Sequence, residues 1–403
     1  MIKSAKTFIN WISLEQQLLL KSALSDSNDA IDAWNEWKSI VDLDKIDYQS
    51  MRLLPMVYYN LHERVGEDKF LNICKGNYRR TWLINKILFD SALPPLRAIT
   101  EENIKILLLK GVSLILRYYK DFGLRPEADF DFLVSIKDRK RAFKVLKNLG
   151  WKPDLGRSTW KDFIKISHKH AVDFVKAGRH IDLHWRSTRH SVESESEDDF
   201  WADSVPCNFG GLTTKCLSPE DELLLIIVHG ARNADNFYCY QPSPIIHWII
   251  DAMRVLASSH TIDWHKFVMR TQKHIARLQI RDTLIYLNRS WNAPIPPNVI
   301  QRISRNPTSM ELFHYAYISR GRGSFWGISN LRIMWGKYVF LYSRVYGGKK
   351  INQLTRIQKL TRFLNFLQII EFQTDHFWKL PFYLIRSILP GQIKRSFLPE
   401  KFK

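Results

Sequence analysis

The chain has 403 residues, of which 45% are hydrophobic and 25% charged, so it is long enough for two or three domains with a real core. Its formal net charge of +20 permits an anionic partner such as nucleic acid, a nucleotide or an acidic membrane surface; alternatively the charge serves only solubility. None of its four cysteines forms a CxxC pair, which excludes the common zinc-ribbon and redox motifs. We see no signal peptide and no apolar run of about 18 residues, and therefore expect a cytoplasmic protein.

Residues 1–95 show helical periodicity. Ser13 and the residues after it have the pattern of a capping box before a run of leucines. Leucine and tryptophan then recur at helical spacing, which is typical of a helical core. A helix around residues 78–89 is expected to end at the pair Pro94-Pro95.

The pattern then changes to that of a sheet. Residues 104–109 form a nearly continuous apolar run, as in a buried strand, and a short helix is expected over about residues 112–119. Lys110 and Gly111 lie between them. Glycine allows close backbone approach, and a helix N-terminus offers free N–H groups to a phosphate. The two residues are therefore a candidate phosphate-binding turn, although a Lys-Gly pair alone is a weak motif.

Two aspartates, Asp129 and Asp131, enter a second apolar run that continues to Val134. Successive side chains of a strand point to opposite faces, so the two carboxylates share one face, and Phe130 and Phe132 point into the core. Carboxylates about 7 Å apart repel each other unless a cation lies between them, and a hard divalent cation such as Mg²⁺ suits that position. The alternative is an edge strand with a solvated acidic face.

A third carboxylate follows on a later strand. Residues 138–149 predict an amphipathic helix, and residues 170–175 and 179–185 alternate apolar and polar residues around an Ala-Gly turn, as in a hairpin. In the second strand of that hairpin, Asp182 and His184 share one face. Three acids on neighbouring strands of one sheet can hold two metal ions for phosphoryl chemistry.

The rest of the chain is predicted to be helical. The acidic segment 186–205 is most simply a solvated loop. Helices are expected after the N-cap Ser218 and over residues 247–256, 264–273 and 280–291. Residues 331–403 contain fourteen Lys or Arg against three Asp or Glu, mixed with bulky aromatic residues. This tail would bind an anionic partner or a membrane surface, or its aromatic faces simply pack on the body.

A spaced set of motifs runs through residues 10–300: Leu109-Lys110-Gly111, Arg125-Pro126, Asp129 to Val134, Ile181 to Trp185, Ser218 to Asp221, His229 to Arg232, Trp248 with Asp251, and Ile262 to Trp264. Together they resemble the uncharacterised bacterial nucleotidyltransferase-like family of the DNA polymerase β-type nucleotidyltransferase superfamily. The set is far more specific than any one of its parts.

The resemblance implies an α+β fold, in which a small mixed β-sheet is flanked by helices and holds two Mg²⁺ ions and an NTP. Asp129 and Asp131 would be the metal-binding pair. Asp182 would be the third carboxylate, which ligates the second metal or takes a proton from the attacking hydroxyl. The residue before the pair is Ala128, where family members often have glycine.

The same resemblance implies a triphosphate site. Lys110 and Gly111 would replace the Gly-Ser turn that contacts phosphate in the wider superfamily, and Arg125 would lie close enough to touch a phosphate. Because this chain has Lys-Gly where the wider superfamily has Gly-Ser, the resemblance is less specific at the triphosphate site than at the three aspartates.

We therefore expect an N-terminal helical region over residues 1–95, a nucleotidyltransferase-like core over 96–210, a helical region over 211–300 and a basic helical region over 301–403. The expected function is Mg²⁺-dependent transfer of an NMP group from an NTP to an unidentified acceptor hydroxyl, with release of pyrophosphate. One alternative is a non-catalytic module that binds nucleotide, nucleic acid or a membrane-surface partner. Another is a zinc hydrolase built from His168, His170, His180 and His184, although their spacing matches no common zinc site.

Overall fold

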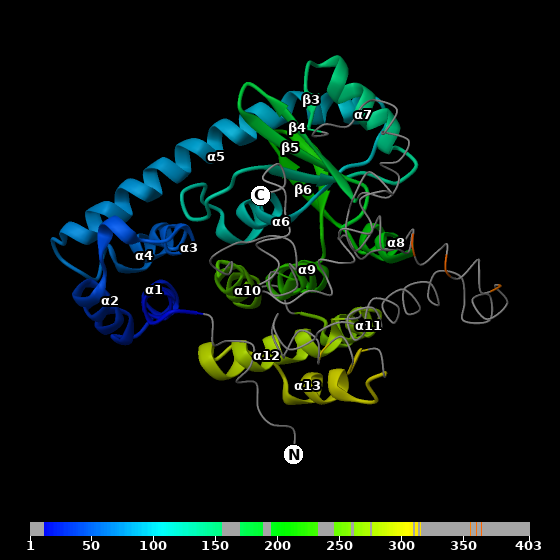
Figure 1. The fold of residues 1–403 in the computed structure, drawn as a ribbon. Coiled ribbons are helices and arrows are strands. Elements are labelled where there is room, and N and C mark those ends of the chain that lie inside the picture. Colours follow the sequence, from blue (N-terminus) through cyan, green and yellow to red (C-terminus); the bar gives the residue numbers. More distant parts are fainter. Residues whose placement is uncertain are drawn as a thin grey trace.

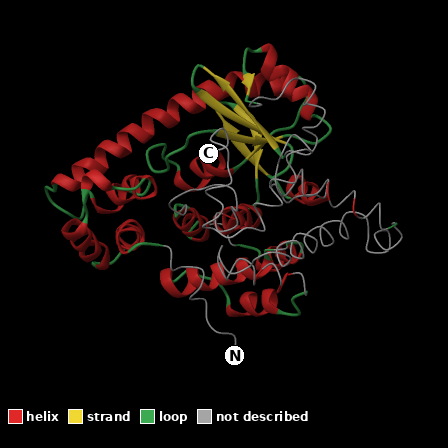
Figure 2. Cartoon of the chain, in the orientation of Figure 1, coloured by secondary structure: helices red, strands yellow, loops and turns green. Residues whose placement is uncertain are grey.

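The computed structural model describes most of the chain up to residue 308. The described ranges are residues 12–154, 170–187, 195–232, 246–258, 262–274 and 276–308, with a few single residues beyond. Within them the predicted α+β class is confirmed, with one mixed sheet between layers of helices (Figure 1, Figure 2). The basic tail 331–403 lies almost entirely outside the described residues.

The N-terminal region is helical, as predicted. Its helices are α1 (Leu14–Leu24), α2 (Asp29–Ile40), α3 (Tyr48–Met51), α4 (Leu54–Leu61) and α5 (Lys69–Glu101), with a 3-10 turn at Leu43–Lys45. The predicted capping box at Ser13 is confirmed, with both reciprocal hydrogen bonds to Gln16 present. Trp34 and Trp37 are fully buried and stack on each other, so the aromatic residues form the core of this region.

The expected helix end at Pro94-Pro95 is wrong. Helix α5 has 33 residues and continues through both prolines to Glu101. Its last turns bury Leu96 and Ile99 against the sheet, in one cluster with Phe130. Each fully buried aliphatic side chain contributes roughly 2 kcal/mol, which offsets the backbone hydrogen bonds that the prolines cannot donate. The predicted boundary at residue 95 thus falls inside α5, and the division into four regions stays a prediction.

Seven strands form the sheet, in the order β3-β4-β5-β2-β1-β7-β6. Their bounds are β1 (Leu107–Leu108), β2 (Phe130–Leu133), β3 (Lys152–Pro153), β4 (Ala171–Lys176), β5 (Arg179–His184), β6 (Val205–Phe209) and β7 (Leu212–Cys216). The predicted strands and the hairpin β4–β5 are confirmed. Strand β2 runs antiparallel to β1 and parallel to β5, so it lies in the centre.

One face of the sheet is apolar and covered. Phe130 and Phe132 from β2 and Ile181 from β5 pack with residues of α5 and of α7 (Arg139–Asn148). On the other side lie α6 (Lys110–Leu114), the π-helical turn η3 (Ile115–Tyr119), α8 (Glu195–Ala202), α9 (Pro219–Arg232) and α10 (Trp248–Leu256) (Figure 1). Helices α11 (Trp264–Gln272), α12 (Arg277–Trp291) and α13 (Pro297–Ser304) follow, and the predicted helices of this region are confirmed.

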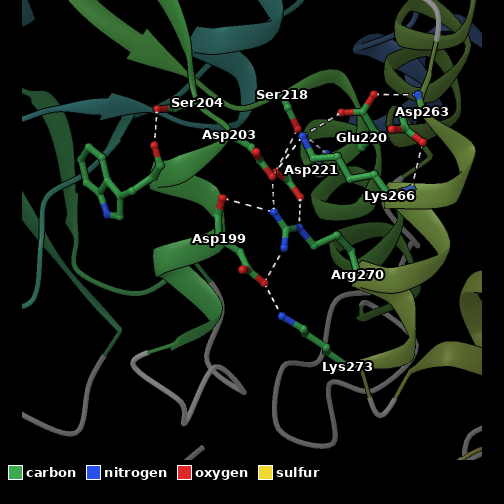
Figure 3. A network of polar contacts seen from close by, with 11 residues as sticks. Asp199, Asp203, Ser204, Ser218, Glu220, Asp221, Asp263, Lys266, Arg270 and Lys273 are labelled. Atoms are coloured by element: carbon green, nitrogen blue, oxygen red, sulfur yellow. Dashed lines mark hydrogen bonds and ion pairs between the residues drawn. The ribbon is translucent and has the colours of Figure 1, made fainter.

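The described part of the acidic segment 186–205 is not the solvated loop that its charge predicted, because it contains helix α8 and the start of β6. Residues 188–194 lie outside the described residues. Two acids of the segment, Asp199 and Asp203, contact helix α11 from a distant part of the chain (Figure 3). Arg270 of α11 contacts Asp199, Asp203 and the fully buried Asp221 at the start of α9. The sequence alone could not show that these charges are neutralised by a helix some 70 residues away.

None of the described helices is long and apolar enough to cross a membrane.

The ion-pair network of Figure 3 predicts an unequal loss of stability for two substitutions in α11. Arg270→Met leaves Asp221 buried without its cation and should lower the free energy of unfolding by about 3 kcal/mol. Lys273→Met removes an exposed pair with Asp199 and should cost less than about 1 kcal/mol. Urea unfolding of both variants measures the two losses of unfolding free energy. Equal losses would show that the buried pair of Arg270 and Asp221 contributes no more stability than the exposed pair of Lys273 and Asp199.

Candidate functional site

The candidate site begins where strand β1 meets helix α6. The backbone N–H of Leu109 donates to the carbonyl oxygen of Asp131 at 3.1 Å, so the end of β1 is fixed beside β2. Lys110 follows with a φ of 52°, in the left-handed region that residues other than glycine seldom adopt. Its ammonium directly contacts Oδ1 of Asp131. The Lys-Gly turn therefore lies next to the acidic strand.

The three predicted acids share a neighbourhood because β2 and β5 pair in parallel. In this register Asp131 lies opposite Asp182. His184 connects the two carboxylates, since its Nε2 lies 2.8 Å from Asp131 Oδ1 and 3.0 Å from Asp182 Oδ2. One ligand atom each from Asp131, Asp182 and His184 can be chosen so that all three lie within 4.8 Å of one another, and Asp129 is not part of this group. Among the described residues this is the group that could hold a metal ion.

Asp131 is 2% exposed, yet its carboxyl group is held in the charged form. Burial opposes that charge, but the ammonium of Lys110 and the hydrogen bond from His184 outweigh burial and lower the pKa of Asp131. Burial likewise opposes a charge on His184, whereas Asp182 and Asp131 outweigh it and raise the pKa of His184 to about 9. The centre of the cluster is therefore a buried anion between two cationic side chains.

Asp129 is in a different situation. Within the described part of the chain its carboxylate accepts no hydrogen bond and forms no ion pair. The charge of Asp131, and then burial, raise the pKa of Asp129 to about 6. Such a carboxylate gains most from a further cation nearby. The paired carboxylates of Asp131 and Asp182, with that of Asp129 close enough to feel the charge of Asp131, therefore fit a hard divalent cation such as Mg²⁺.

Gly111 lies under a pair of side chains rather than open to solvent. A Cβ atom there would overlap the ends of the Arg125 and Glu127 side chains, so a larger residue would have to displace this ion pair. Arg125 forms an ion pair with Glu127 and a bidentate pair with Asp251 of α10, at 2.7 and 2.8 Å. In this structure its guanidinium is bound by two carboxylates, and its contact with a phosphate stays a prediction.

Buried polar contacts fix the helix that carries Lys110. Ser113 donates to Glu222 of α9 at 2.6 Å, and the hydroxyl of Tyr119 donates to Asp251 of α10 at 2.7 Å. Both contacts tie α6 and η3 to the helices beneath the sheet. The Lys-Gly turn is thus held from its strand and from both helices, which fixes the backbone from which Lys110 reaches the acids.

His184 is the site residue that the sequence named only as a ligand in the zinc alternative, and not as part of the acidic site. Its signal was its position, two residues after Asp182 on the same strand face. The zinc alternative is not supported by the described residues, because His180 instead pairs with Asp173 at 2.8 Å and the candidate metal group contains a single histidine. His168 lies outside the described residues.

A protein-family model described as an uncharacterised nucleotidyltransferase matches residues 46–292, which is more than half of the chain. The matched range contains β1, β2 and β5 and every residue of the acidic cluster. A search of curated proteins returned no match. The family match favours the catalytic expectation over a non-catalytic module, and it leaves the acceptor open. The chain therefore belongs to this family of uncharacterised nucleotidyltransferases and is a transferase.

Proposed function

We propose that the chain is a Mg²⁺-dependent nucleotidyltransferase that moves an NMP group from an NTP to an acceptor hydroxyl and releases pyrophosphate. The observation that carries this proposal is the cluster on β2 and β5, where Asp131 and Asp182 lie side by side and Asp129 has no cation of its own within the described residues. The family match supports nucleotidyl transfer in general.

The residues that would hold two Mg²⁺ ions are Asp129, Asp131 and Asp182. When bound, the ions would offset the charge that develops on the phosphate oxygens during transfer. His184 would keep two of these carboxylates in place, since its ring contacts both. Its second ring nitrogen, Nδ1, lies 3.3 Å from the carbonyl oxygen of Arg186, which orients the imidazole.

The chain's own groups then serve the substrates. Asp182 is the most exposed member of the buried group, at 20% of its side chain, so we assign it the proton of the attacking hydroxyl. The acceptor oxygen forms a bond to the α-phosphorus as the bond to the bridging oxygen of the β-phosphate breaks, and pyrophosphate leaves. Lys110, the backbone at Gly111, and Arg125 are the proposed phosphate contacts.

The partners follow from this reaction. The substrates are an NTP and an acceptor that carries a hydroxyl. A third partner is proposed from charge alone: the basic tail 331–403 would bind an anionic partner such as nucleic acid or a membrane surface. A cytoplasmic location, with or without peripheral contact to a membrane, belongs to the same proposal.

Asp129→Asn separates a catalytic from a structural role. The substitution should lower Mg²⁺-dependent NTP turnover by about a hundredfold or more, because several kcal/mol of charge stabilisation are lost. It should not destabilise the fold. The raised pKa of Asp129 means that its ionised form opposes folding near neutral pH, so the melting temperature should stay equal or rise. Turnover of α-labelled NTP in cell lysate and thermal unfolding give the two readouts.

The matched control is Asp173→Asn on β4. Asp173 lies opposite Asp182 in the sheet but pairs with His180 at 2.8 Å, whereas Asp129 has no such ion pair within the described residues. NTP turnover by the Asp173→Asn variant should remain within about threefold of wild type, as for a surface substitution. Equal loss in both variants, or full activity of Asp129→Asn, would contradict the assigned metal site.

The raised pKa of Asp129 also predicts a pH dependence of metal affinity. A proton competes with the cation below the pKa of about 6, so metal affinity should rise about fivefold from pH 5 to 6, about twofold from pH 6 to 7, and flatten above. The pKa of His184 lies near 9, so its charge is constant over this range. Binding of Mn²⁺, as a spectroscopic substitute for Mg²⁺, measures the profile. A flat profile between pH 5 and 7 would show that Asp129 does not bind the ion.

A further inference from the structure

The ammonium of Lys110 contacts a carboxylate oxygen of the proposed metal site. It contacts Oδ1 of Asp131, the same oxygen that faces Nε2 of His184. A carboxylate oxygen offers two lone pairs, and both are engaged here by protein groups. A cation that binds through this oxygen must therefore take over a contact that the chain already makes.

The charges of the cluster lead to the same conclusion. The Lys110 ammonium contacts Asp131 and lies 3.4 Å from Nε2 of His184, so it lies among the atoms of the candidate metal group. A divalent cation bound by that group would lie close to the ammonium, and like charges at short distances repel strongly inside a protein. Lys110 is the side chain that can leave, because it is 24% exposed whereas His184 is fully buried.

The structure leaves Lys110 free to move without a change of backbone. Its main chain is held by β1 on one side and by the contacts of α6 with α9 on the other. Its side chain has four rotatable bonds and is 24% exposed, so the ammonium can move several ångströms while the turn stays fixed.

We propose that Lys110 is an exchangeable counter-cation. It neutralises Asp131 while the site holds no metal, gives up that contact when a divalent cation binds, and then pairs with the triphosphate of the incoming NTP. The inference rests on the proposed function, which supplies both the cation and the nucleotide. It adds that metal and NTP bind cooperatively, because the ion releases the ammonium that the nucleotide uses and each ligand therefore favours the other.

The test measures Mn²⁺ binding alone, from the electron paramagnetic resonance signal of the free ion, on the full chain without nucleotide. Lys110→Met removes the competing ammonium and should lower the dissociation constant for Mn²⁺ at least tenfold relative to wild type. Lys110→Arg keeps the charge and should bind Mn²⁺ as weakly as wild type. A non-hydrolysable NTP analogue should tighten Mn²⁺ binding to wild type clearly more than to Lys110→Met.

The matched control is Lys120→Met. Lys120 is also a lysine on left-handed backbone, with a φ of 56°, but its side chain is exposed and forms no ion pair within the described residues. Its Mn²⁺ affinity should equal that of wild type. If Lys110→Met fails to fold without metal, Lys110→Gln takes its place, because an amide can still donate to Asp131 but carries no charge.

The outcomes separate this inference from the function on which it rests. Unchanged or weaker Mn²⁺ binding by Lys110→Met, with binding lost in Asp131→Asn, overturns the exchange alone. Mn²⁺ binding that survives in Asp131→Asn overturns the proposed metal site itself. Tighter binding in Lys110→Met, with Lys110→Arg and Lys120→Met at the wild-type value, supports the exchange.

Discussion

The charge of Asp131 is the constraint around which this structure is built. A carboxylate that is 2% exposed in the middle of a sheet is stable as an anion only if cationic or hydrogen-bonding groups surround it. Lys110 directly follows the end of β1 on one side of β2, and His184 lies at the end of β5 on the other side. The placement of both depends on β2 lying between β1 and β5. A metal site and a phosphate site can then be neighbours, because the same turn carries Lys110 and begins helix α6.

The remaining parts of the fold position this arrangement. The apolar face of the sheet is covered by α5 and α7, so the acidic cluster faces away from the main sheet core. Beneath it, Ser113 and Tyr119 bond to α9 and α10, which makes the Lys-Gly turn a rigid support for a flexible side chain. Rigid backbone with one mobile cation is the combination that an exchange of counter-ions requires.

Local pattern was enough to predict the strands that carry Asp129, Asp131 and Asp182, because alternation assigns each side chain to a face. Long-range pairing was not. The parallel register of β2 with β5 and the contact of Arg125 with Asp251 join residues 50 to 130 positions apart, and no local pattern encodes such contacts. The same limit explains both errors. Pro94-Pro95 ends a helix unless a sheet packs against the next turn, and an acidic run is solvated unless a basic helix lies beside it. The assigned functions of the site residues remain proposals that local pattern, family and geometry jointly support.

The proposed function requires that Asp129 and the acids of β2 and β5 hold the divalent cations of nucleotidyl transfer. Anomalous diffraction of Mn²⁺ in crystals grown with a non-hydrolysable NTP analogue tests this requirement. We expect Mn²⁺ peaks bounded by the carboxylates of Asp129, Asp131 and Asp182, with the triphosphate beside Lys110. Mn²⁺ or nucleotide bound elsewhere, with these three carboxylates unengaged, would contradict it.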